Sequence, residues 1–210
     1  MLCSRLALNS GRGNKTACMT GSVIQNLKTG SGKLITRLLK EFSYPSILIF
    51  ASTKDNVKHL GRLLPKLGLP SKAIHSDLEQ NEREEILREF KNKQLKLLIG
   101  TDVLSRGIDV EGIGLVINYD VPPDPEDYIH RIGRTASAES TGHAITFINE
   151  RDQRRFFQIE KLIGREITKA TLPDGIGPSF EYAPEKSRDG HAKQSKSKGA
   201  RKFFKKRSPR

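Results

Sequence analysis

The stretch "LKLLIGTDVLSRGID", residues 95–109, joins a short apolar run directly to a dense group of polar side chains. A near-continuous apolar run of this kind is typical of a parallel strand that is buried on both faces of a sheet. Ligands of such sheets bind in the loops at the carboxyl ends of the strands. A capped turn would explain Thr101 and Asp102 but not the Arg-Gly-Ile-Asp sequence of residues 106–109. The stretch therefore predicts a strand followed by a binding loop.

Four other short apolar runs, rich in Ile and Val, share this character and alternate with helical patterns. The runs are residues 46–52, 72–75, 115–121 and 143–149. The helical patterns are an apolar stripe of Val57, Leu60, Leu63, Leu64 and Leu67, the segment 79–91, a helix start at Asp124-Pro125 and a helix end at Gly164. Strands that alternate with helices at this spacing predict a three-layer α/β domain with a largely parallel central sheet.

Length and composition restrict the classes of protein that the chain can belong to. Its 210 residues suffice for one domain of roughly 150 residues with tails. Cys3 and Cys18 are the only cysteines, which argues against a disulfide framework or a zinc site and favours a reducing cytoplasm. We expect no membrane span, because the sequence contains no run of 18 apolar residues. We expect no bound metal either.

The positive charge is concentrated at the carboxyl terminus. Residues 185–210 contain eleven Lys and Arg and two acids, so they carry +9 of the net charge of +13. Few apolar residues accompany these charges, and a segment of this composition cannot offset the entropy of ordering. We expect residues 166–210 to form a linker and a disordered basic tail that binds nucleic-acid phosphates, or alternatively a tail that only improves solubility.

The stretch "TGSGKL", residues 29–34, raises the possibility of a phosphate loop near the amino terminus. Such a loop needs a hydroxyl after the lysine to hold Mg²⁺, and Leu34 follows Lys33 here. Leu27 stands where the first glycine of the pattern belongs, and the preceding "SVIQNLK" is too polar for a central strand. We therefore expect a flexible polar segment, within an unstructured leader that spans residues 1–32.

A second polar stretch, "YIHRIGRT" at residues 128–135, lies on the helix that begins at Asp124-Pro125. Arg131 and Arg134 are three residues apart and are expected to share one helix face. Two guanidinium groups on one face favour anion binding, with bidentate contacts to phosphate if the geometry allows. The alternative is a solvated basic helix whose arginines pair with neighbouring carboxylates.

Taken in order, these segments resemble the second RecA-like domain of superfamily 2 helicases, and specifically the DEAD-box RNA helicases. "ILIFAST" resembles motif IV of that family, Gln80 and Arg83 its Q-x-x-R element, "TDVLSRGID" motif V and "HRIGRT" motif VI. The resemblance covers about residues 33–165 and is closest to the RhlE-like branch, whose members commonly have basic tails. It implies a RecA-like domain of the P-loop NTPase type.

The resemblance also implies two functional surfaces and their partners. The RNA backbone would be bound by Thr53, Gln80, Arg83, Thr101, Asp102 and Arg106. ATP would be bound by Gly107, Asp109, Arg131 and Arg134, of which Arg131 and Arg134 would be catalytic. His130 would couple this lobe to a first RecA-like lobe, which would hold most of the ATP and Mg²⁺.

Two departures from the family pattern limit the activity that we expect. The chain lacks the motifs of the first lobe, and Ser137 replaces the last arginine of motif VI, the family's finger on the transferring phosphate. Such a finger is worth roughly 10³–10⁵ in rate. We expect a monomeric half of an ATP-dependent RNA helicase that is inactive alone. The alternatives are a non-enzymatic RNA-binding or annealing module and, with less support, the second lobe of a DNA-translocating helicase.

Overall fold

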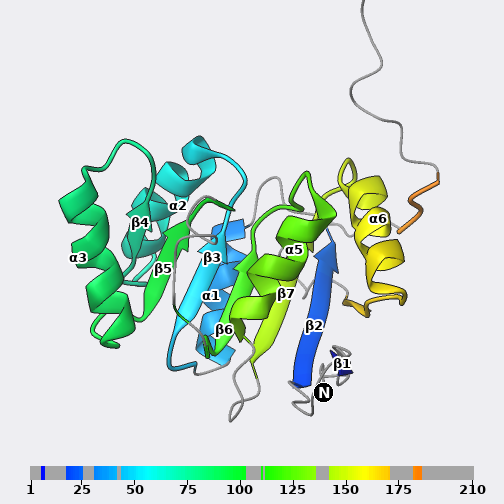
Figure 1. Ribbon diagram of the computed structural model, residues 1–210, viewed down its shortest axis with the longest axis horizontal. Coiled ribbons are helices and arrows are strands. Elements are labelled where there is room, and N and C mark those ends of the chain that lie inside the picture. Colours follow the sequence, from blue (N-terminus) through cyan, green and yellow to red (C-terminus); the bar gives the residue numbers. More distant parts are fainter. Residues whose placement is uncertain are drawn as a thin grey trace, which may run out of the picture.

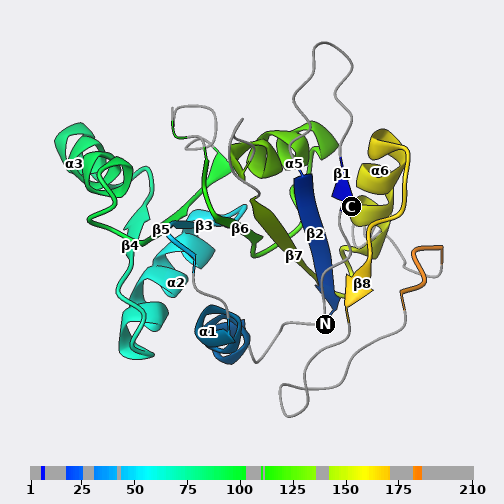
Figure 2. The same cartoon turned by 90° about the horizontal axis from the view of Figure 1, so that it is seen from below.

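A computed structural model describes most of the chain between residues 31 and 170 and parts of both ends. The described residues are 6–7, 18–25, 31–41, 44–102, 110, 112–135, 142–170 and 182–185. They form one central sheet with helices on both faces (Figure 1, Figure 2). The strand order is β1-β2-β7-β6-β3-β5-β4, and β8 pairs with β2. Every pair in the described residues is parallel except β1 with β2. The predicted three-layer α/β fold is confirmed.

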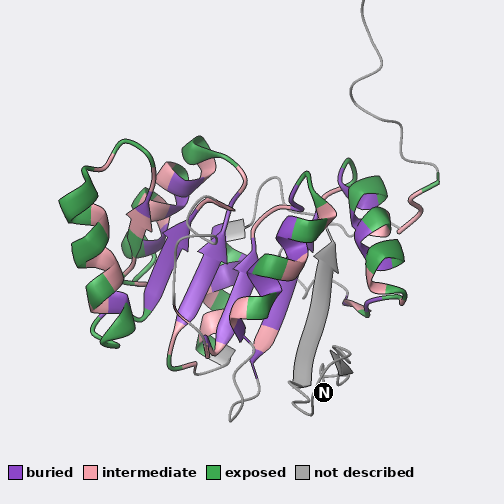
Figure 3. Ribbon diagram, viewed as in Figure 1, coloured by how far each residue is buried: buried purple, intermediate pink, exposed green. Residues whose placement is uncertain are grey.

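The strands in the middle of the sheet come from the apolar runs of the sequence. They are β3 (Ile47–Phe50), β4 (Lys72–Ile74), β5 (Leu97–Gly100), β6 (Leu115–Asn118) and β7 (His143–Ile148). All four residues of β3, β5 and β6 are buried, as Figure 3 shows. Burial on both faces explains why these strands have apolar runs rather than alternating patterns.

The helices divide between the two faces of the sheet. Helices α1 (Ser31–Glu41) and α2 (Lys54–Lys66) cover one face, where they share an apolar cluster with Ile49, Ile99 and Ile117. Helices α3 (Gln80–Lys91), α5 (Pro125–Ile132) and α6 (Gln153–Ile163) lie on the other face (Figure 2). Successive strand residues point to opposite faces, so β3, β5, β6 and β7 each contribute to apolar clusters on both sides.

The helix ends agree closely with the sequence signals. The Asp124 side chain accepts a hydrogen bond from the Glu126 backbone N–H at 2.9 Å, with Pro125 at the first helical position of α5. Gly164 ends α6 in the left-handed conformation, with φ at 74°. Helix α2 continues to Lys66, so Pro65 lies in its last turn and does not interrupt its body.

At the amino terminus the structure differs from the expected leader. Residues Cys18–Gln25 form β2, which runs parallel to β7 from Thr20↔His143 to Gln25↔Ile148, and Leu6–Ala7 form the short β1. Without β2, the N–H and C=O groups on one side of β7 would face no strand. Backbone pairing therefore orders a segment whose mixed composition did not predict a strand.

The expectation of a flexible segment at "TGSGKL" was wrong for residues 31–34, which form the first turn of α1. Leu34 and Ile35 are fully buried in the apolar core, whereas Lys33 is exposed. A Cβ atom on Gly32 would lie 2.9 Å from side-chain carbons of both Leu63 and Leu67. Gly32 is thus explained by the close approach of α1 to α2 and not by a bound phosphate.

Part of the predicted linker also belongs to the folded domain. Lys169–Ala170 form β8, beside β2. Tyr182 donates a hydrogen bond to Glu160 at 2.8 Å, and its ring meets that of Phe156 edge-on at 6.4 Å. The rest of the tail lies outside the described residues. None of the helices within the described ranges is long and apolar enough to cross a membrane.

Candidate nucleic-acid interface

The register of the three central strands brings polar residues together at the carboxyl edge of the sheet. Phe50 at the end of β3 pairs with Gly100 of β5 and with Asn118 of β6. Two residues beyond each of these positions lie Ser52, Asp102 and Asp120. Because the strands are parallel and in register, these three side chains reach the same level of the fold.

Arg131 of α5 enters this group and is fully buried. Its Nε and Nη2 atoms donate to the two carboxylate oxygens of Asp102, the second at 2.8 Å, which makes a bidentate pair. Nη2 also donates to the Ser52 hydroxyl at 3.2 Å, and Nη1 to the Asp120 backbone carbonyl at 3.1 Å. The guanidinium lies 5.5 Å from the centre of the Phe50 ring. One side chain therefore contacts the ends of all three central strands.

Asp120 completes the network from the side of β6. Its carboxylate accepts hydrogen bonds from the Ser52 backbone N–H at 2.8 and 3.0 Å and from the Ser52 hydroxyl at 2.5 Å. It also accepts one from the Asn56 side-chain amide in the first turn of α2, at 3.3 Å. The network thus fixes the start of α2 relative to the strand ends. Burial is the main cause that raises the pKa of the nearby Asp152 to about 6, and the negative charge of Asp120 adds to this rise.

The two arginines of "YIHRIGRT" have different surroundings. Arg131 follows the buried Tyr128 by three residues and points into the fold, where Asp102 and Asp120 balance its charge. The expectation that Arg131 and Arg134 form one anion-binding face does not match this burial. Arg131 pairs with neighbouring carboxylates, as in the alternative, but it is buried and not solvated. Arg134 is half-buried in the 3-10 turn Gly133–Thr135, and its backbone carbonyl accepts a hydrogen bond from Ile113. His130 is exposed.

A cavity of about 440 Å³ opens beside this network at the same edge of the sheet. Three of the residues expected to bind RNA line it, namely Gln80 and Arg83 of α3 and Thr101 after β5. Thr53 is exposed and caps α2 between Ser52 and Lys54, which both line the cavity. The β4–α3 loop adds His75 and Ser76. Asp102, also expected to bind RNA, is instead held by Arg131.

The polar groups of the cavity are suited to an anionic, hydroxyl-rich ligand. Within the described residues, the Arg83 Nε and His75 Nδ1 atoms are buried and have no hydrogen-bond partner. The Gln80 side-chain amide N–H donates a hydrogen bond to Glu84 at 2.7 Å. The side-chain carbonyl oxygen of Gln80 takes no part in this contact and can accept a hydrogen bond from a ligand. Hydroxyls of Ser52, Ser76 and Thr101 also line the cavity, together with Lys54, Glu84 and the apolar Ile74 and Leu87. Such donors and acceptors are typical of sugar and phosphate recognition.

The described residues do not by themselves fit ATP with Mg²⁺. In the described ranges, no group of three or more His, Cys, Asp or Glu could hold a metal ion. Lys33 lies on α1, on the opposite face of the sheet from α5. Arg106, Gly107, Asp109 and Ser137 lie outside the described residues.

Comparison with known proteins assigns the family. Residues 31–139 match the family model of the helicase conserved C-terminal domain. The chain belongs to this family. It is 44% identical over 135 residues to a probable ATP-dependent RNA helicase of Methanocaldococcus jannaschii, covering 64% of this chain and 36% of that relative. The helicase C-terminal domain thus spans about a third of the length of that relative.

Solved structures of DEAD-box proteins are similar to this helicase C-terminal domain. The E. coli DEAD-box protein SrmB, bound to regulator of ribonuclease activity A, gives a TM-score of 0.70 at 25% identity, covering 78% of this chain and 95% of that one. S. cerevisiae Dbp5 bound to RNA and ADP BeF3 gives 0.65 at 32% identity, covering 72% and 41%. The predicted family and the predicted lobe are confirmed.

Sequence reasoning missed Ser52 and Asp120, which lie at the centre of the network. The signal was present in the spacing, because each residue lies two positions after the end of a buried strand. One residue separates Asp120 from the apolar run "VIN", and one residue likewise separates Asp102 from the run "LLIG". Strand register, which the sequence does not state, was needed to see that the three positions coincide.

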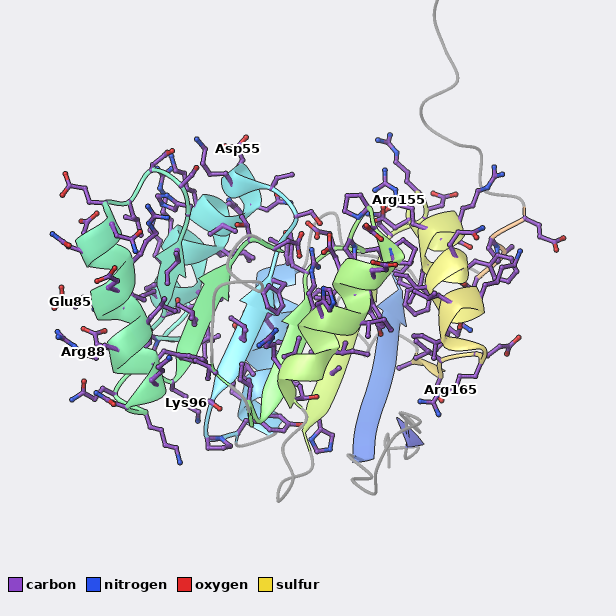
Figure 4. The ribbon with its side chains drawn as sticks, viewed as in Figure 1. Asp55, Glu85, Arg88, Lys96, Arg155 and Arg165 are labelled. Carbon is purple, nitrogen blue, oxygen red and sulfur yellow. The ribbon has the colours of Figure 1, made fainter. Side chains whose placement is uncertain are left out.

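We predict that Arg131→Met lowers the free energy of unfolding by about 3 kcal/mol, because it leaves Asp102 and Asp120 without their buried cation. Methionine retains much of the apolar volume, so the loss reflects mainly charge and hydrogen bonding. Arg88→Met is the control, since Arg88 is exposed on α3 and points away from the sheet (Figure 4). The control should change the value by less than about 0.5 kcal/mol in urea unfolding followed by circular dichroism. Equal effects of the two variants would contradict a stabilising role for Arg131.

Proposed function

We propose that this chain acts as the second lobe of an ATP-dependent DEAD-box RNA helicase. In this role it binds the RNA backbone at the carboxyl edge of its sheet and contributes to an ATP site shared with a first lobe. Closure of the two lobes on single-stranded RNA would separate a duplex locally. The basic tail supports a place near the RhlE-like branch, and the two cysteines support a reducing cytoplasm. We expect a single copy per complex.

The observation that carries the proposal is the meeting of Gln80, Arg83 and Thr101 on one cavity. Gln80 and Arg83 belong to α3 whereas Thr101 follows β5, and the fold brings the helix and the strand end together. Their amide, guanidinium and hydroxyl groups can bind phosphate and ribose without reading bases. Thr53, next to the cavity, is proposed as a fourth contact, and Arg106 as a fifth on sequence grounds alone. The similarity to Dbp5, whose structure was solved with RNA and ADP BeF3, supports this assignment.

For the ATP site we propose Arg134, with Gly107 and Asp109 from the motif that follows β5. Arg134 directly follows α5 in the turn that Gly133 begins, and the exposed His130 is proposed to couple the two lobes. Arg131 is better assigned as a positioning residue, since its guanidinium is enclosed by the fold. Its contribution would be to hold Asp102 and the adjoining chain in place.

The competing proposal is an RNA-binding or annealing module without enzymatic activity. Two sequence features favour this proposal, namely Ser137 in place of the arginine and the basic tail. The cavity also favours it, because RNA could bind there without ATP. Both proposals require RNA binding, but they differ in whether a first lobe restores turnover.

We predict that the purified chain alone shows no RNA-stimulated ATP hydrolysis, because the described residues supply neither a phosphate loop nor a metal site. Phosphate release well above the buffer background in a clean preparation would contradict this. Addition of a DEAD-box first lobe to the chain and to its Ser137→Arg variant then separates the two proposals. Restored unwinding in either mixture supports the helicase lobe, and RNA binding without unwinding in both supports the module.

We predict that Arg83→Ala weakens RNA binding and reduces the slope of log affinity against log salt by about 0.7, the value expected for one lost phosphate contact on a single strand. Arg88→Ala is the matched control on the same helix, since Arg88 points away from the sheet (Figure 4). Fluorescence anisotropy with an oligouridylate at several KCl concentrations measures both quantities. If the two variants lose affinity equally, the cavity is not the RNA site.

A further inference from the structure

Lys54, which lines the cavity, and Lys58 hold one carboxylate between them. Lys54 and Lys58 lie one turn apart on α2, and Asp77 lies on the β4–α3 loop. Lys54 Nζ donates to Asp77 Oδ1 at 2.8 Å, and Lys58 Nζ donates to the other oxygen, Oδ2. Hydrogen bonds from Lys54 and then Lys58 hold the pKa of Asp77 well below its usual range.

We propose that Lys54 and Lys58 form a subsite for an RNA phosphate, and that Asp77 occupies this subsite while the protein is free. The proposal rests on the RNA binding proposed above and adds a phosphate contact that the family resemblance did not supply. Asp77 would act as an internal competitor, which lowers the affinity for RNA until a phosphate replaces it.

The chemistry of the three side chains supports an exchange of anions. A carboxylate and a phosphodiester both carry one negative charge spread over two terminal oxygens. Each Asp77 oxygen accepts from a different lysine, so the two ammonium groups are placed to bind the two oxygens of one anion. The hydrogen bond to Asp77 is the main cause that raises the pKa of Lys54, and the charge of the neighbouring Asp55 adds to it.

The exchange costs little because all three side chains are accessible. The exposed fractions are 45% for Lys54, 31% for Lys58 and 42% for Asp77. Ion pairs at such exposed sites contribute little to stability, so one phosphate contact can replace this one. The surroundings also favour it, since Lys54 itself and Ser76, the neighbour of Asp77, both line the cavity. A strand bound in the cavity would therefore pass within reach of the two lysines.

The test is a cycle of variants of the full chain, with an oligouridylate as the probe. Asp77→Asn should raise the affinity by about threefold to tenfold and steepen the salt slope by about 0.7, since one more phosphate is neutralised. In a Lys54→Met, Lys58→Met background, Asp77→Asn should change neither quantity. Glu85→Gln on the outer side of α3 is the control for a general effect of charge (Figure 4).

The outcomes separate this subsite from the wider function. A gain that Glu85→Gln reproduces, or one that persists without the two lysines, would overturn the subsite in favour of a general electrostatic effect. A fall in melting temperature with weaker binding for Asp77→Asn would also overturn it, because Asp77 would then act by holding the loop. If Arg83→Ala weakens binding while the Asp77 cycle shows nothing, only the subsite fails. If neither has an effect, RNA binding at the cavity fails as well.

Discussion

A single buried cation, Arg131, holds together the edge of the sheet at which the candidate site lies. Its guanidinium satisfies Asp102 in a bidentate pair and reaches both Ser52 and the backbone of Asp120. A buried charge that is removed from water must be paired with opposite charges or hydrogen-bond partners, since one unpaired buried ion costs several kcal/mol. This requirement constrains the ends of β3, β5 and β6 together. The start of α2 is fixed by the same network through Asn56 and Asp120.

The position of the cavity follows from this constraint. Thr101 precedes Asp102, and Thr53 follows Ser52, so these two proposed RNA contacts are chain neighbours of residues in the network. Gln80 and Arg83 approach from α3, whose start is set by the capping box of Glu79 and Glu82. The network therefore positions Thr53 and Thr101, while Arg131 itself remains buried in the fold. In the proposed function, Arg131 would act through the strand ends that it holds, because its guanidinium is buried.

Much of the fold was readable from the sequence, because strands buried on both faces leave apolar runs and helix ends carry caps. Five strands, the start of α5 and the end of α6 follow from these signals. Strand β2 was missed because backbone pairing with β7, rather than apolar content, orders it. Helix α1 was missed because its glycines and Lys33 suggested a loop. The burial of Arg131 could not be seen either, since helical spacing gives a face but not what the face packs against.

Mapping of backbone amides by NMR tests the central claim most directly. Titration of the ¹⁵N-labelled chain with an oligouridylate should shift the amides of Ser52, Thr101 and Gln80 at the carboxyl edge. A second, more apolar cavity of about 240 Å³, lined by Leu39, Leu69 and Lys96 among others, lies at the opposite edge and provides the internal reference. Of these two groups of amides, only those at the carboxyl edge should shift. Shifts around Leu69 and Lys96, with the carboxyl edge unmoved, would contradict the account.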